Sequence, residues 1–127
     1  MLSIFYVAIG GAFGSVARFL LMNVIGKQVD SQFPYGTLVV NILGSFLMGM
    51  LVACLARFAP EHQHNMRNLI GIGILGGFTT FSTFSLDMVT LIQRGEPVYA
   101  TVYALASVLL CMLGLIGGLY LMRILPV

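Results

Sequence analysis

Four long apolar stretches, separated by short polar connections, constrain this chain more than any other feature. They run over about residues 3–25, 35–58, 69–92 and 99–125. An apolar helix needs about 20 residues to cross the hydrocarbon core of a bilayer. Only 8% of the residues are charged, whereas a soluble domain carries about 25%, so most of the surface must face lipid. The sequence therefore predicts an all-α membrane protein, a single transmembrane domain of four helices over residues 1–127.

The basic residues are too few and too scattered to fix an orientation in the membrane. One side would carry both termini and residues 59–68, and the other side would carry the two remaining connections. The first side then has Arg57, Arg67 and Arg123, and the second has Lys27 and Arg94, plus Arg18 if it snorkels. The positive-inside rule therefore gives almost no preference. Two alternatives stay open: dual insertion, with oppositely inserted copies pairing as a homodimer, or one orientation set by a very small charge bias.

The same scattered charges form no basic patch, so we expect no nucleic-acid partner.

Small residues recur four positions apart in the expected spans. Gly10 and Gly14 have this spacing, and so do Gly114 and Gly118. In lipid, such residues allow helix backbones to approach closely. The pattern is common in membrane helices, so it predicts tight packing and no particular function.

Two of the expected helices carry a stripe of polar residues at membrane depth. Each stripe has the spacing i, i+4, i+8, which places its members on one helix face. The stripes are Thr37, Asn41 and Ser45 in the second span and Tyr103, Ser107 and Cys111 in the fourth. One stripe alone would be explained by hydrogen bonds between helices. Two stripes together with the unusual third span favour a narrow polar path.

The third span contains the polar, glycine- and phenylalanine-rich segment 76–85, with the sequence GGFTTFSTFS. Paired glycines weaken a helix, and the Ser and Thr hydroxyls compete for backbone hydrogen bonds. An unwound turn would free backbone carbonyls, which are suitable ligands for a small cation, but only where protein or a cavity surrounds them. An unbroken helix with back-bonded hydroxyls is the alternative, and residue types alone leave both open.

Four further side chains stand out within the spans. Phe81 and Phe84 would share a helix face, where they would pack against neighbours or present positive ring edges to an anion. Arg18 could snorkel, cap a neighbouring carbonyl or set a positive potential at an anion entrance. Asp87 could pair with a base or be solvated in a vestibule. Spacing does not decide among these roles.

Three segments together resemble the Fluc family of fluoride channels, also called CrcB-type proteins. Residues 10–18 (GGAFGSVAR) resemble the first-helix motif of that family, and residues 37–45 (TLVVNILGS) match its second-helix motif. Residues 76–84 (GGFTTFSTF) match the third-helix motif, which is highly specific. The resemblance covers the whole chain in order. It implies an antiparallel dual-topology homodimer in the bacterial inner (plasma) membrane, with the third helix broken at mid-membrane and two pores that export fluoride passively.

The resemblance also implies roles for individual residues. Phe81 and Phe84 would line the pores, and the Asn41 amide would contact them. Hydroxyls would form a polar track along Thr37, Ser82, Thr83, Tyr103 and Ser107. Cys111 stands where some relatives have Ser, which puts its hydrogen-bond role in doubt, and Asp87 stands where relatives often carry Glu near a vestibule. Backbone carbonyls of Gly76 and Thr79 from both copies would hold a central structural sodium ion.

Other classes of protein fit the sequence less well. A small dual-topology multidrug transporter also has four spans, but it needs a membrane-embedded carboxylate for proton exchange. The only acidic residue in any expected span is Asp87, near the end of the third. A purely structural subunit would need neither polar stripes nor a disrupted helix. We expect no enzyme, because the sequence offers no nucleophile–base pair and no metal-ligand cluster.

Overall fold

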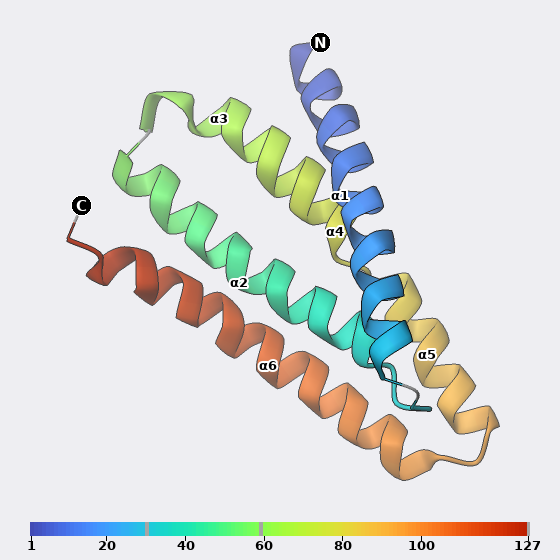
Figure 1. The fold of residues 1–127 in the computed structure, drawn as a ribbon. Coiled ribbons are helices and arrows are strands. Elements are labelled where there is room, and N and C mark those ends of the chain that lie inside the picture. Colours follow the sequence, from blue (N-terminus) through green and yellow to red (C-terminus); the bar gives the residue numbers. More distant parts are fainter. Residues whose placement is uncertain (30, 59, 127) are drawn as a thin grey trace.

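The computed structural model describes residues 1–29, 31–58 and 60–126. Asp30 and Ala59, which fall in two of the expected connections, lie outside the described residues, as does Val127. The chain forms four helical rods, each long and apolar enough to cross a membrane. In chain order the elements are α1 (Leu2–Gln28), α2 (Tyr35–Phe58), η1 (Pro60–His62), α3 (Gln63–Met66), η2 (Arg67–Leu75), α4 (Gly76–Phe78), α5 (Phe81–Gln93) and α6 (Pro97–Ile124) (Figure 1). The expected all-helical class with four membrane-spanning helices is therefore confirmed.

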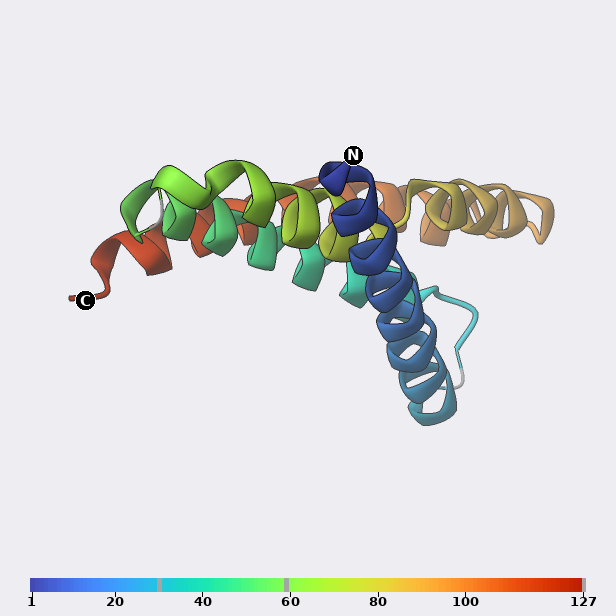
Figure 2. The same ribbon diagram turned by 90° about the horizontal axis from the view of Figure 1, so that it is seen from above.

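Three of the rods lie in one layer, and α1 leaves it. α2 and α6 run side by side along much of their length, and the rod from α3 to α5 lies next to them (Figure 1). Seen from above, α1 crosses this layer at a steep angle, and its C-terminal half points away from it (Figure 2). The packing partners of α1 are chiefly η2 and α4, together with part of α2.

The third rod changes its backbone geometry along its length. Helix α3 continues into η2, a nine-residue π-helix, and then into α4. At Thr79 and Thr80 the backbone becomes extended, with φ/ψ of −82°/157° and −151°/119°. Helix α5 then begins at Phe81. The third rod is thus interrupted at Thr79 and Thr80, which lie within the glycine- and phenylalanine-rich segment 76–85.

Glycines allow α1 and the third rod to touch through their backbones. A Cβ atom added at Gly14 would collide with the carbonyl of Ile74, and one added at Gly10 would lie 2.9 Å from the nitrogen of Ile74. The same holds between α2 and α6, where a Cβ on Gly118 would collide with the carbonyl of Phe46. The spacing of small residues therefore predicted real backbone contacts.

The turn between α5 and α6 explains why one helix ends and the next begins. Gly95 has φ = +75°, a left-handed conformation that glycine adopts without strain. Its N–H donates to the carbonyl of Ile92 at 3.1 Å, and the N–H of Glu96 donates to that of Leu91 at 2.9 Å. These bonds satisfy the last carbonyls of α5. Pro97 then starts α6 with a preset φ.

Few side chains are fully buried, because lipid rather than protein covers most of the apolar surface. The main buried cluster lies where α2, α5 and α6 meet and consists of Leu38, Leu91, Ala100 and Tyr103. At the other end, Arg57 donates to the carbonyls of Met122 and Leu125 at 2.9 and 2.8 Å. This guanidinium joins the C-terminal ends of α2 and α6 and satisfies carbonyls that the helix itself leaves free.

Candidate functional site

An open pocket of about 290 Å³ lies between α2, α6 and the interruption of the third rod. Its lining residues are Asn41, Ser45, Thr79, Thr80, Phe81, Phe84, Ser107, Val108 and Cys111. Both polar stripes of the sequence contribute to it, because α2 and α6 pack side by side and turn those faces towards the interruption. The lining consists of hydroxyls, one amide, one thiol and apolar groups, and none of these residues is charged at neutral pH.

The Asn41 side chain fixes the interruption from α2. Its amide nitrogen donates to the carbonyl of Thr80 at 3.1 Å, and its oxygen accepts from the Thr80 N–H at 2.8 Å. This pair replaces the backbone bonds that Thr80 would make in a continuous helix. Asn41 therefore both lines the pocket and supports the non-helical turn.

Thr80 caps the second half of the rod. Its hydroxyl accepts from the Thr83 N–H at 3.1 Å, as an N-cap residue does, and donates to the Thr83 hydroxyl at 3.1 Å. The Ser82 hydroxyl lies 3.3 Å from the same atom. The predicted hydroxyls of Ser82 and Thr83 thus gather around Thr80 and are not among the pocket-lining residues. Thr80 is a site residue that the sequence reasoning above does not include, although a Thr just before a helical run is an N-cap signal.

Aromatic rings form a row that leads away from the pocket. The centroids of Phe81 and Phe84 are 5.4 Å apart, and those of Phe84 and Tyr103 are 5.0 Å apart. Phe33, before α2, continues the row at 5.6 Å from Tyr103 in an edge-on arrangement. Phe81 is 79% exposed in the single chain, whereas Tyr103 is completely buried. The row therefore connects an open rim to the interior, and Phe33 is a member that the sequence did not indicate.

Tyr103 and Asp87 lie together beyond the pocket. The Tyr103 hydroxyl donates to Oδ2 of Asp87 at 2.9 Å, so the partner of this carboxylate among the described residues is a neutral hydroxyl. Thr37 is also buried, at 2% exposure. These three predicted residues do not line the pocket. Tyr103 is also the member of the aromatic row that packs against Phe84.

Ser107 provides an unused hydrogen-bonding group at the pocket. The residue is 8% exposed, and its hydroxyl has no partner among the described residues. A buried polar group without a partner costs free energy, so it marks a place where a ligand or water can bind. Cys111 and Ser45 line the same pocket.

Arg18 reaches the interruption from α1. Its Nη1 donates to the carbonyl of Thr79 at 3.2 Å. Of the three roles left open by the sequence, the structure shows the capping of a carbonyl. Arg18 does not line the pocket.

The carbonyls of Gly76 and Thr79 meet part of what a sodium ion requires. The Thr80 N–H would bond to Gly76 in an unbroken helix, but it donates to Asn41 instead, which releases the Gly76 carbonyl from that partner. The Thr79 carbonyl is also outside the helical pattern, but it accepts from Arg18. Backbone carbonyls suit a hard cation, yet two of them do not complete its coordination. A sodium ion at these two carbonyls would therefore require further oxygens from elsewhere.

Comparisons with known proteins agree with this architecture. The family model described as CrcB-like protein, Camphor Resistance (CrcB), matches residues 5–119. A protein of Erythrobacter litoralis named fluoride-specific ion channel FluC is 45% identical over 122 residues, which cover 93% of this chain and 90% of the relative. Proteins of the same name from Chelativorans sp. and Mesorhizobium japonicum are 46% and 43% identical, and they cover 97% and 99% of this chain and 98% and 100% of their own lengths.

The match therefore includes all four helices and the interruption. Residues 5–119 extend from the first turns of α1 to the last turns of α6. The relatives are similar in length as well as in sequence. This chain is a multi-pass membrane protein and belongs to the CrcB-like family.

Proposed function

We propose that the protein is a passive, fluoride-selective channel that exports fluoride from the cytoplasm across the bacterial plasma membrane. The observation that carries the proposal is the pocket lined by uncharged donors, including the buried Ser107 hydroxyl, which has no partner within the described part of the chain. Fluoride is small and strongly hydrated, so a pore must replace its water with other donors. Neutral hydroxyls and an amide supply hydrogen bonds without the tight binding that a fixed cation would cause. The name of the relatives supports this choice of ion.

Within this proposal, the aromatic row forms one wall of the ion path. The edge of an aromatic ring carries partial positive charge and attracts an anion weakly. Phe81, at the open rim, and Phe84, beside Tyr103, would pass the ion between the pocket and the interior. Asn41 and Ser107 would donate to it along the way.

The working unit in this proposal is an antiparallel homodimer with two pores. In a single chain the pocket is open and Phe81 is largely exposed, so a second copy is needed to close the path. The nearly equal numbers of basic residues at the two ends permit both orientations. The interruption of the third rod would lie at mid-membrane. There the carbonyls of Gly76 and Thr79 from both copies would together hold a structural sodium ion at the centre of the dimer.

Passive fluoride efflux from liposomes tests the function. Purified protein is reconstituted in liposomes loaded with potassium fluoride, and external fluoride is recorded with an electrode after valinomycin is added to balance charge. We expect rapid fluoride release and no chloride release from matched chloride-loaded liposomes. Absence of fluoride release, or equal release of chloride, would show that the protein is not a fluoride-selective channel.

A further inference from the structure

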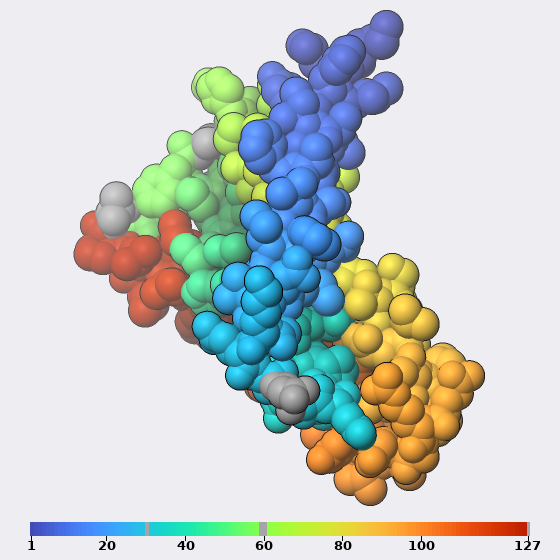
Figure 3. Space-filling model, turned by 45° about the vertical axis from the view of Figure 1, so that its right-hand side comes forward, coloured from blue at the N-terminus to red at the C-terminus, as the bar shows by residue number. Residues whose placement is uncertain are grey.

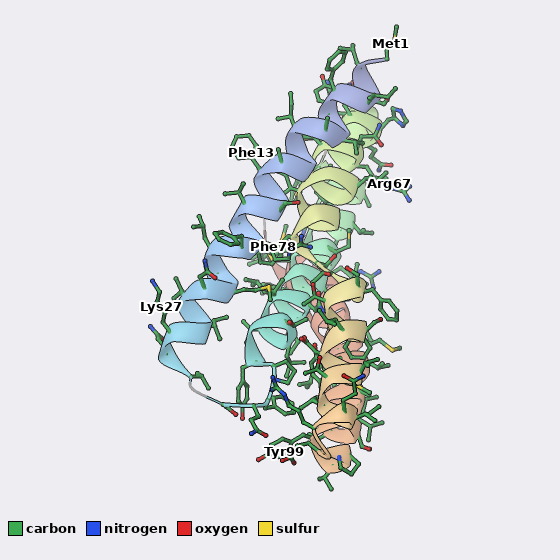
Figure 4. The ribbon with its side chains drawn as sticks, turned by 90° about the vertical axis from the view of Figure 1, so that its right-hand side faces the viewer. Met1, Phe13, Lys27, Arg67, Phe78 and Tyr99 are labelled. Carbon is green, nitrogen blue, oxygen red and sulfur yellow. The ribbon has the colours of Figure 1, made fainter. Side chains whose placement is uncertain are left out.

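Arg18 places a positive charge next to the interruption of the third rod. The residue lies in α1, ten residues before the helix ends at Gln28, and is half-buried. It reaches the interruption because α1 and the third rod are in backbone contact nearby. A Cβ at Gly77 would lie 2.7 Å from the Gly11 carbonyl oxygen and 3.2 Å from the Ser15 hydroxyl. In Figure 4, Phe78 marks this meeting of α1 with α4.

The Thr79 carbonyl is available to Arg18 because helical bonding stops at this residue. The Thr79 N–H still bonds to the Leu75 carbonyl at 3.0 Å, as in a helix. Its ψ of 157° then turns the carbonyl out of the helical direction. The guanidinium donates to it at 3.2 Å, while Asn41 holds Thr80 on the other side. Two side chains from two helices thus clamp the two non-helical residues.

Arg18 and the proposed sodium ion would use the same oxygen atom. Both are cations, and a sodium ion on the Thr79 carbonyl would lie directly beside the guanidinium. Like charges so close repel strongly where protein and lipid exclude water. Both cations would also be attracted to the dipole of the same Thr79 carbonyl.

We propose that Arg18 is a positioning residue that holds the interruption open in the absence of sodium and whose positive charge lowers the affinity of the protein for sodium. This inference rests on the sodium site of the proposed function. Arg18 keeps the Thr79 carbonyl out of the helix before the ion arrives. The cost is repulsion of the ion, so the sodium affinity of the wild-type protein is set below what the carbonyls alone would give.

The substitution Arg18→Gln separates the charge from the hydrogen bond, because the amide is neutral but still a donor. The purified protein is heated in increasing sodium chloride, with N-methylglucamine chloride keeping ionic strength constant, and far-UV circular dichroism reports unfolding. A bound ion raises the unfolding temperature as its site fills. We expect the half-saturating sodium concentration to fall by at least about tenfold in Arg18→Gln. Without sodium, Arg18→Gln should unfold at a lower temperature than the wild type.

Two variants control for folding and for charge in general. Arg18→Lys keeps the charge and should need nearly the wild-type sodium concentration. Arg94→Gln removes the same charge at the exposed end of α5 and should leave the sodium response unchanged. If Arg18→Gln folds only when sodium is added, the ion has replaced the clamp, which supports the proposal. If it stays unfolded in saturating sodium, the proposal is wrong.

The remaining outcomes separate this inference from the proposed function. An unchanged or higher half-saturating concentration in Arg18→Gln would overturn the inference, even if the wild type binds sodium and releases fluoride. A wild type with no sodium response would overturn the sodium site and this inference together, whether or not it releases fluoride. If the half-saturating sodium concentrations change as expected but the protein releases no fluoride, the inference is supported and the proposed channel function is contradicted.

Discussion

At the scale of single residues, the Ser107 hydroxyl distinguishes a ligand site from ordinary packing. A hydroxyl that served only to join helices would have a partner, as the Tyr103 hydroxyl does in Asp87. The Ser107 hydroxyl is buried at the pocket without a partner among the residues that the structure describes. Its removal should therefore affect ion passage and stability in opposite ways.

The substitution Ser107→Ala tests this expectation. Because no hydrogen bond is lost within the chain, the unfolding temperature should stay the same or rise. Loss of one donor to an anion should slow fluoride efflux from liposomes by about tenfold or more. Thr101→Ala removes another α6 hydroxyl, one that bonds to the Pro97 carbonyl and is exposed, and should leave efflux unchanged. A normal efflux rate in Ser107→Ala would show that Ser107 does not contribute to the ion path.

The two phenylalanines of the row give a second test at this scale. Phe81→Ile and Phe84→Ile keep an apolar side chain of similar size but remove the ring edge, so the fold should survive. Fluoride efflux should fall by at least about tenfold in each variant, because the weak attraction of the ring edge is lost. Phe13→Ile is the matched control, since Phe13 is 69% exposed and points away from the other helices (Figure 4). Normal conduction in both row variants would contradict the role of the rings.

At the scale of elements, the interruption shows which parts of the structure the sequence could predict. Paired glycines and a run of hydroxyls indicated where the third helix would be disturbed, but they left an unbroken helix equally open. The decision depends on Asn41, which is 39 residues away in the chain and bonds to Thr80. Such a distant partner is not visible in local propensity. For the same reason, local sequence patterns did not indicate that Phe33 belongs to the aromatic row.

The π-helical geometry of η2 was equally hidden. Residues 67–75 have the composition of an ordinary apolar helix, and nothing in their residue types indicates the π-helical geometry. Gly71 and Gly73 are buried there, and Gly10 of α1 touches the backbone of η2. By contrast, the long apolar stretches predicted the helices of α1, α2 and α6 because lipid requires an internally bonded backbone throughout a span.

Adjacent glycines in α6 provide a matched test of close helix packing. A Cβ at Gly118 would collide with the Phe46 carbonyl, whereas one at Gly117 would meet nothing within 4 Å. Gly118→Ala should therefore force α2 and α6 apart and cost about 1–3 kcal/mol. Gly117→Ala should be neutral or slightly stabilising, because alanine favours the helix. Thermal unfolding of the two variants compares them, and equal unfolding temperatures would contradict the packing described here.

At the scale of the whole molecule, a single chain leaves much of its surface open on one side. The C-terminal half of α1 lies away from α5 and α6, with Lys27 and Tyr99 far apart (Figure 4). The space-filling view shows α1 lying across this face, with α5 and the start of α6 emerging beside it (Figure 3). The proposed dimer would cover part of this open surface. Because its two chains are antiparallel, the chain must insert into the membrane in both orientations.

Dual insertion predicts labelling from both sides of the membrane. A single cysteine is placed at the end of α1 by Gln28→Cys in a background of Cys54→Ala and Cys111→Ser. In sealed vesicles, a membrane-impermeant maleimide should label about half of the protein, because the charges give no preferred orientation. The rest should react only after the vesicles are opened. Complete labelling, or none, in sealed vesicles would show a single orientation.

The most direct test of the channel is the reversal potential of single-protein currents in a planar bilayer. With a fluoride gradient across the bilayer and equal chloride on both sides, a passive fluoride-selective pore must reverse at the Nernst potential of fluoride. We predict this value, unchanged when a proton gradient is added. A reversal potential near zero, or one that follows the proton gradient, would contradict the proposed function.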